Sequence, residues 1–304
     1  MSPRERLAAA LRDRVAGPEA EERARRIWLA PGPRRFRAQD PICRVHHHAA
    51  MYPGGIRALL LQSLHPLAMA GVGEHSGYRG DPWGRLQRTS EFIATTTFGR
   101  IEDADRVIDR INRMHERVRG TARDGRPYDA TDPHLLLWVH VAEIDSFLTA
   151  HQRYSRTPLS PAEADTYVAQ AAWTAEALGV PRAPRSVAEL SGVLASYEPE
   201  LEASEGALDA AAFLLREPPL PVVARPGYWL LAAGAVALLP ERAREMLGLR
   251  LAGPAVLDRS VQYAAGRLGG IGTAAVGWAL SSPEDPRNAP ESSAVPDAPP
   301  GRAA

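Results

Sequence analysis

One histidine lies on the apolar face of an expected helix. Ile108, Ile111, His115 and Val118 follow one another at steps of three, four and three residues, so they share one helix face. The spacing is typical of a core histidine that is hydrogen-bonded to a nearby carbonyl. It also fits an axial ligand of an iron porphyrin, because a non-covalent haem needs a neutral imidazole on a rigid, apolar support. Covalent c-type attachment is excluded, since the sequence has no Cys-x-x-Cys-His motif.

Two arginines and a threonine begin another expected helix. Arg85 and Arg88 are three residues apart, and Thr89 follows Arg85 by four, so their side chains cover one patch. An ion pair between Asp81 and Arg85 on the surface would explain the pattern without any function. The functional interpretation is a cluster that holds haem propionates or lies on the distal side, because guanidinium binds carboxylates through two parallel hydrogen bonds.

His65 lies in a nearly uniform apolar segment and is followed by Pro66. A buried imidazole needs a partner there, because an unsatisfied polar group costs roughly 1–3 kcal/mol. A structural hydrogen bond and a role in a pocket explain this histidine equally well. Glu74 and His75 follow in the next loop and are further candidates for the same space.

His140 and Glu143 are three residues apart in a segment of apolar residues. They can form a buried pair that satisfies itself, or they can orient His115 or a bound water from the second coordination sphere. His140 is also the alternative haem ligand. The run His46-His47-His48 is a weak metal signal, because adjacent residues point in different directions. A di-iron bundle is disfavoured, since the chain has no Glu-x-x-His pairs.

Composition limits the possible functions further. The chain has 304 residues, 45% hydrophobic and 24% charged, with a formal net charge of zero, so nothing suggests a nucleic-acid partner. All of its basic residues other than histidine are arginines, and the lack of lysine excludes Schiff-base and P-loop chemistry. A single cysteine, Cys43, excludes a disulfide framework. No apolar run approaches the roughly 20 residues of a membrane span, and we expect a cytoplasmic protein.

The elements that must position these residues are helices. Residues 1–44 are expected to form an N-terminal helical arm, residues 45–280 one globular all-α domain, and residues 281–304 a disordered tail that is too polar to fold. Helices are expected over 1–16, 19–29, 56–72, 82–98, 102–120, 133–154, 161–178, 187–196, 205–216, 228–239 and 254–268. The strongest starts are Asp81-Pro82, Asp132-Pro133 and the Ser160–Glu163 capping signature. A loop is expected at residues 53–55 and a kink at His65.

Several motifs occur in an order that resembles the MpaB / rubber-oxygenase family, which includes latex clearing protein and was long classed as a domain of unknown function. They are LLLQSLHPLAMAGV, HSGYRGDPWGRLQRTSEFIATTTFG, MHERVRG and YDATDPHLLLWVHVAEIDSFL. The resemblance is good over residues 40–180 and looser to about residue 270. It implies a globin-like helical core that holds a non-covalent haem b, with dioxygen used to cleave carbon–carbon double bonds in isoprenoid chains.

The resemblance also assigns residues. The family's distal motif Arg-x-x-Lys-Thr reads Arg85-Leu-Gln-Arg88-Thr89 here, and His115 matches the axial histidine on the following helix. Arg88 replaces a lysine, and a guanidinium does not ligate iron as a neutral amine can. We therefore expect a haem-dependent oxygenase that acts on a hydrophobic small molecule with Arg85, Arg88, Thr89 and His65 in its site. The alternative is a haem-binding sensor or carrier without turnover.

Overall fold

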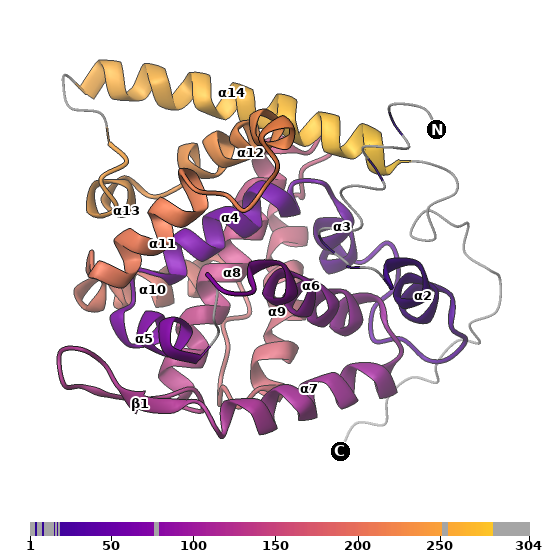
Figure 1. The fold of residues 1–304 in the computed structure, drawn as a ribbon. Coiled ribbons are helices and arrows are strands. Elements are labelled where there is room, and N and C mark those ends of the chain that lie inside the picture. The colour runs from indigo at the N-terminus through magenta and orange to yellow at the C-terminus, as the bar shows by residue number, and fades with distance from the viewer. Residues whose placement is uncertain are drawn as a thin grey trace.

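The computed structural model describes residues 19–75, 79–250 and 255–281, together with four isolated positions before residue 19. Within these ranges the protein is all-α apart from one small hairpin, which confirms the predicted fold class (Figure 1). The α-helices are α2 (Ala20–Ala24), α3 (Pro41–His47), α4 (Met51–Gln62), α5 (Pro66–His75), α6 (Pro82–Phe98), α7 (Ile101–His115), α8 (Pro133–Tyr154), α9 (Pro161–Ala177), α10 (Val187–Ser196), α11 (Glu205–Leu215), α12 (Arg225–Ala237), α13 (Glu241–Met246) and α14 (Ala255–Leu280). A π-helical turn η1 (Arg25–Leu29) and the 3-10 turns η2 (Glu198–Glu200) and η3 (Val222–Ala224) complete the order.

Three of the predicted helix starts are confirmed by their caps. The Asp81 carboxylate accepts a hydrogen bond from the Gly84 N–H, and Asp132 caps α8 in the same way. Ser160 and Glu163 form a reciprocal capping box at the start of α9. Each cap satisfies a backbone donor that has no partner within the helix, which is why these boundaries could be predicted from sequence.

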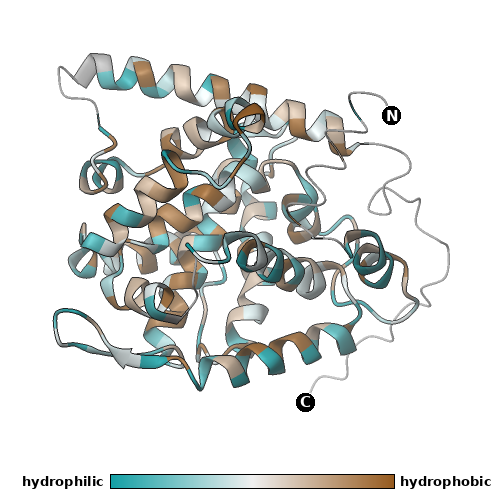
Figure 2. Cartoon of the chain, viewed as in Figure 1, coloured by the Kyte–Doolittle hydropathy of each residue, from teal (hydrophilic) through white to brown (hydrophobic). Residues whose placement is uncertain are grey.

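Helices α4 and α8 form the centre of the molecule, and their contact depends on Gly54. A Cβ at this position would lie 3.1 Å from Cδ1 of Phe147 and 3.3 Å from Cβ of Ala150, so glycine lets the helices approach closely. Arg57 of α4 is buried in the same contact, where it pairs with Asp145 at 2.7 Å and donates to the Leu238 carbonyl. Hydrophobic residues gather along these central helices (Figure 2).

The predicted loop at residues 53–55 is wrong, because these residues lie inside α4. Pro53 is in the first turn, where its missing N–H costs no hydrogen bond, and Gly54 is needed for packing. The predicted kink at His65 is a complete break between α4 and α5. Pro66 is the first residue of α5, a position that proline favours.

Other elements also differ from the prediction. Helix α7 ends at His115 rather than Gly120, and strands β1 (Arg119–Thr121) and β2 (Pro127–Asp129) form an antiparallel hairpin with Gly120 opposite Tyr128. Helices α3 and α13 were not predicted. Helix α14 continues to Leu280, beyond the predicted end at residue 268, and Gly269 and Gly272 in its second half pack against α12.

At the crossing of α12 and α14, Gly234 faces Gly269. A Cβ on Gly234 would come within 2.6 Å of the Gly269 Cα, and the Tyr154 hydroxyl donates to the Gly234 carbonyl beside this contact.

Nearly all of the predicted helix over 1–16 and the predicted tail lie outside the described residues. In the described part of the chain, no helix combines the length and the apolar character that crossing a bilayer requires. The globin-like core and the division into an arm and a main domain stay predictions.

Candidate functional site

His115 is the last residue of α7, and its side chain is half-buried. Its Nδ1 atom is buried without a hydrogen-bond partner, and burial lowers the pKa of the ring below its usual value. One turn earlier, Asn112 donates a hydrogen bond to the Ala177 carbonyl at 3.1 Å. Residues three apart share a helix face, so the His115 side of α7 is directed toward the carboxyl end of α9.

His140 and Glu143 lie on the side of α8 that packs on α9. One turn before His140, Leu136 and Leu137 contact an apolar cluster that includes Ala172 and Ala175 of α9. His140 and Glu143 continue this side of α8, and His115 of α7 is directed toward the same helix. The three side chains are therefore directed toward α9, His115 from α7 and His140 and Glu143 from α8.

His140 and Glu143 are strongly desolvated and do not pair with each other within the described structure. Burial lowers the pKa of His140 to about 4, and its Nε2 atom is buried without a partner. Burial raises the pKa of Glu143 to about 7, so its carboxyl exchanges a proton near neutrality. The sequence prediction of a self-satisfied pair is therefore wrong. The predicted role of either residue in orienting His115 or a water stays a prediction.

A chain of polar groups runs through the adjacent interior. The His46 Nδ1 atom lies 2.8 Å from the Thr97 hydroxyl of α6, and its Nε2 atom lies 3.4 Å from the Tyr167 hydroxyl of α9. Burial lowers the pKa of His46 to about 3, so the ring is neutral. The Glu143 charge contributes to the raised pKa of Tyr167, which places that carboxyl near the chain. Sequence reasoning missed Tyr167, because one tyrosine in an alanine-rich helix carries no local signature.

Arg85, Arg88 and Thr89 lie in the first two turns of α6. Arg88 pairs with Asp81 at 3.3 Å, and both side chains are 63% exposed. Thr89 is exposed and Arg85 is half-buried. The surface pair of Asp81 is therefore with Arg88 and not, as expected, with Arg85. The assignment of these residues to a haem site stays a prediction.

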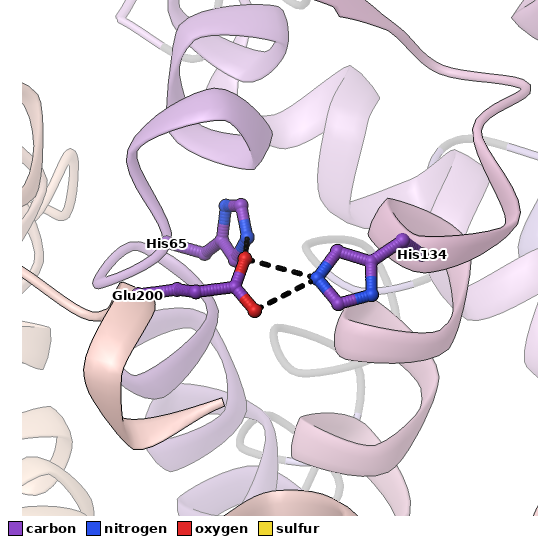
Figure 3. A group of neighbouring side chains, drawn as sticks. All are labelled: His65, His134 and Glu200. Atoms are coloured by element: carbon purple, nitrogen blue, oxygen red, sulfur yellow. Dashed lines mark hydrogen bonds and ion pairs between the residues drawn. The ribbon is translucent and has the colours of Figure 1, made fainter. Parts of the chain in front are cut away.

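His65 lies with His134 and Glu200 (Figure 3). Its Nε2 atom is 3.4 Å from the Glu200 carboxylate, and the His134 Nε2 atom is 2.9 Å from the same oxygen. Glu74, the other candidate from that region, accepts a hydrogen bond of 2.5 Å from the Tyr128 hydroxyl. The His75 side chain lies outside what the structure describes.

The chemistry of His115 on α7 and His140 on α8 fits that of an axial haem ligand. An axial imidazole must be neutral with an available nitrogen, and burial makes both His115 and His140 neutral. Each also has a buried ring nitrogen without a hydrogen-bond partner, which is a costly arrangement in a protein interior. Binding a metal through an imidazole nitrogen is one way to satisfy such a ring.

Comparison with known families identifies the chain. The model of the ER-bound oxygenase mpaB/B'/rubber oxygenase catalytic domain matches residues 43–270. The chain belongs to this family. It therefore contains an oxygenase-family catalytic domain that covers most of its length, and the match runs from within α3 to within α14.

Two curated relatives are similar over a shorter region. An uncharacterized protein of Mycobacterium bovis and one of Mycobacterium tuberculosis are each 31% identical over 100 residues, which is 33% of this chain. The match spans 39% of each relative, about two fifths of its length. No solved structure is significantly similar to the chain.

Proposed function

We propose that the protein is a haem b-dependent oxygenase that uses dioxygen on a hydrophobic, isoprenoid- or lipid-like substrate. Family membership supports the oxygenase class. The observation that carries the haem is the pair of neutral histidines, His115 and His140, whose buried ring nitrogens have no partner. Oxidative cleavage of a carbon–carbon double bond is the reaction that the rubber-oxygenase resemblance suggests.

In this proposal His115 ligates the iron, and His140 is the alternative ligand. Arg85 and Arg88 hold the propionates or the distal side through charge-assisted hydrogen bonds, and Thr89 adds a hydroxyl donor. A bound haem would supply the iron centre at which dioxygen is activated. The guanidinium of Arg88 offers N–H donors and a positive charge but no acceptor, so Arg88 would act as a hydrogen-bond donor and would not bind the iron.

Glu143 is the group that can move a proton in this interior. Its pKa of about 7 keeps a substantial fraction protonated at neutral pH, whereas an ordinary glutamate would be ionised. The neighbouring His46 and His140 rings stay neutral under the same conditions, so they can accept or donate hydrogen bonds but hold no additional proton.

The test begins with the absorption spectrum of the purified protein after haemin is supplied. We expect a Soret band in the wild type and loss of most of it in His115→Ala. Survival of the band in His115→Ala with loss in His140→Ala would transfer the axial role to His140. A spectrum without a Soret band would end the haem proposal.

Turnover separates an oxygenase from a haem-binding sensor or carrier. The reduced protein is mixed with oxygenated buffer and an unsaturated isoprenoid or lipid, and oxygen uptake and substrate loss are followed together. An oxygenase consumes both. Reoxidation of the haem without loss of any substrate would support the carrier instead.

A further inference from the structure

His65, His134 and Glu200 come from three separate elements and meet at one point (Figure 3). His65 lies in the turn between α4 and α5, His134 in the first turn of α8, and Glu200 at the end of η2. One ring nitrogen of each histidine and a carboxylate oxygen all lie within 4.8 Å of one another. His115, His140 and Glu143 are not members of this group.

Tyr197 fixes the tautomer of His134. The Tyr197 hydroxyl donates to the His134 carbonyl at 2.8 Å, so its oxygen can only accept a hydrogen bond from the His134 Nδ1–H at 3.2 Å. In a neutral ring the Nε2 lone pair then points at the Glu200 carboxylate, 2.9 and 3.0 Å away. Two acceptors in contact need a proton or a cation between them.

His65 supplies the third ligand atom, a buried ring nitrogen. Its side chain is only 2% exposed, and its Nε2 atom has no hydrogen-bond partner although it points toward Glu200. The Nδ1 atom lies 3.5 Å from the Ala68 N–H, longer than a normal hydrogen bond, so this contact holds the ring tautomer only weakly. Trp138 and Tyr197 enclose the ring on its other sides.

We propose that His65, His134 and Glu200 bind a divalent transition-metal ion of the Zn²⁺ class, with one coordination position open to water. Two imidazoles and one carboxylate are a common zinc ligand set. Tetrahedral coordination with bonds of about 2.0–2.1 Å separates neighbouring ligand atoms by roughly 3.4 Å. The His65–Glu200 separation already has this value, and the His134–Glu200 contact needs to open only slightly. Such an ion would join the α4–α5 turn, α8 and η2.

Calorimetric titration of the full chain with Zn²⁺ tests the site. We expect one ion per chain in the wild type, and loss of at least tenfold in affinity in both His134→Asn and Glu200→Gln. Tyr197→Phe, which removes the acceptor for the His134 Nδ1–H, should weaken binding by about 10–100-fold. His47→Asn is the matched control, because His47 is exposed and lies outside the cluster.

A protonated His134–Glu200 ion pair without a metal is the rival explanation. Equal Zn²⁺ affinity in all variants, or no binding at one ion per chain, would overturn the metal site in favour of that pair. Thermal unfolding gives a second measurement: Zn²⁺ should raise the melting temperature of the wild type but not of His134→Asn. The Soret band is independent of these measurements, so failure of the haem proposal and failure of this one are distinguishable.

A second inference rests on the outer face of α14, which lies along one edge of the molecule (Figure 1). Apolar residues recur at positions 261, 264, 268, 271, 275 and 278, the alternating steps of three and four that form the seam of a coiled coil. The larger ones are exposed: Val261 is 50%, Leu268 43%, Ile271 60% and Trp278 54% accessible. Trp278 keeps this exposure although Arg4 stacks on its ring.

The order of side chains along this seam is self-complementary. If a second α14 runs antiparallel about a two-fold axis between Leu268 and Ile271, these two residues face each other. The same register pairs Ala264 with Ala275 and Val261 with Trp278. Small residues then meet small ones and large residues meet large ones, as an isologous interface requires. An apolar patch that binds unrelated surfaces would not require large and small residues to match about a two-fold axis.

We infer that the outer face of α14 pairs with the same face of a second copy of this chain. The seam from Val261 to Trp278 is about 26 Å long, which makes an interface smaller than the standard area of about 800 Å² per partner. The dimer should therefore depend on concentration. Sedimentation equilibrium should show dimers that dissociate on dilution, and Leu268→Glu should be monomeric throughout.

Tyr263→Glu is the matched control, because Tyr263 is 66% exposed on the same helix but lies off the seam. It should dimerise like the wild type. A monomeric wild type, or equal loss of the dimer in both variants, would overturn the pairing. If the monomeric wild type binds lipid vesicles and Leu268→Glu does not, the face is a membrane contact instead.

Cysteine cross-linking tests the direction of the helices. A mixture of Val261→Cys and Trp278→Cys chains should form a disulfide, whereas Val261→Cys alone should not, because its two copies lie about 26 Å apart in the antiparallel register. The native Cys43 is buried and does not interfere. Efficient cross-linking of Val261→Cys to itself would indicate parallel pairing and refute the register.

Discussion

Replacing Glu143 by glutamine should change how the stability of the protein depends on pH. Burial raises the pKa of this carboxyl from an ordinary 4.5 to about 7, so the folded protein binds its proton more tightly than the unfolded chain does. This difference corresponds to about 3 kcal/mol. The favourable contribution of protonated Glu143 to the free energy of unfolding is fully present below pH 4.5 and is lost as the pH rises through about 7.

The assay is urea unfolding of the wild type and Glu143→Gln at several values from pH 4 to pH 8. A glutamine does not ionise, so the variant avoids the loss that the wild type suffers as the pH rises. The difference in free energy of unfolding between variant and wild type should therefore shift by about 3 kcal/mol in favour of the variant from pH 4 to pH 8. Glu22→Gln serves as the control, because Glu22 is exposed in α2 and should leave the profile unchanged. Parallel curves for the wild type and Glu143→Gln would refute the desolvation argument and with it the proton-carrying role.

Three further predictions concern stability. Arg57→Met should lower the free energy of unfolding by about 3–5 kcal/mol, because it leaves the partly buried Asp145 without its partner; chemical denaturation measures this loss. Gly54→Val should lower the free energy of unfolding by about 1–3 kcal/mol and separate α4 from α8, because the new Cβ would press on Phe147. Thermal unfolding measures this loss, and unaltered stability would contradict it. Asp81→Ala should cost about 1 kcal/mol through the lost cap of α6, seen as a lower denaturation midpoint.

The helices could be predicted where local chemistry determines them. Asp81, Asp132 and Ser160 each satisfy a backbone donor within their own first turn, so the sequence contains the whole interaction. The failures come from glycines whose role is decided by distant partners. The loop predicted at residues 53–55 follows the local rule that assigns glycine to turns, yet Gly54 lies inside α4 where α8 approaches. Gly269, one residue beyond the predicted end of the last helix, likewise lies where α12 approaches.

The candidate site was predictable in part for the same reason. His115 and His140 stand out because a histidine within an apolar pattern is visible along one helix. Tyr197 and Glu200 are more than sixty residues from His134, and no periodicity connects them. Their contribution to the His65 cluster depends on how α8, α10 and η2 fold together, which sequence spacing does not show.

The glycine crossing of α12 and α14 also affects how the C-terminal helix attaches. Gly234 and Gly269 approach backbone to backbone, so neither residue has a side chain that loses rotamer freedom when the two helices come together. Neither residue has a side chain that could adapt to a partial separation. Docking of α14 should thus be a cooperative event in which the helix is either fully seated or released. Because the seated helix presents the outer seam, assembly of two chains would reinforce that attachment and protect this end of the protein from proteases.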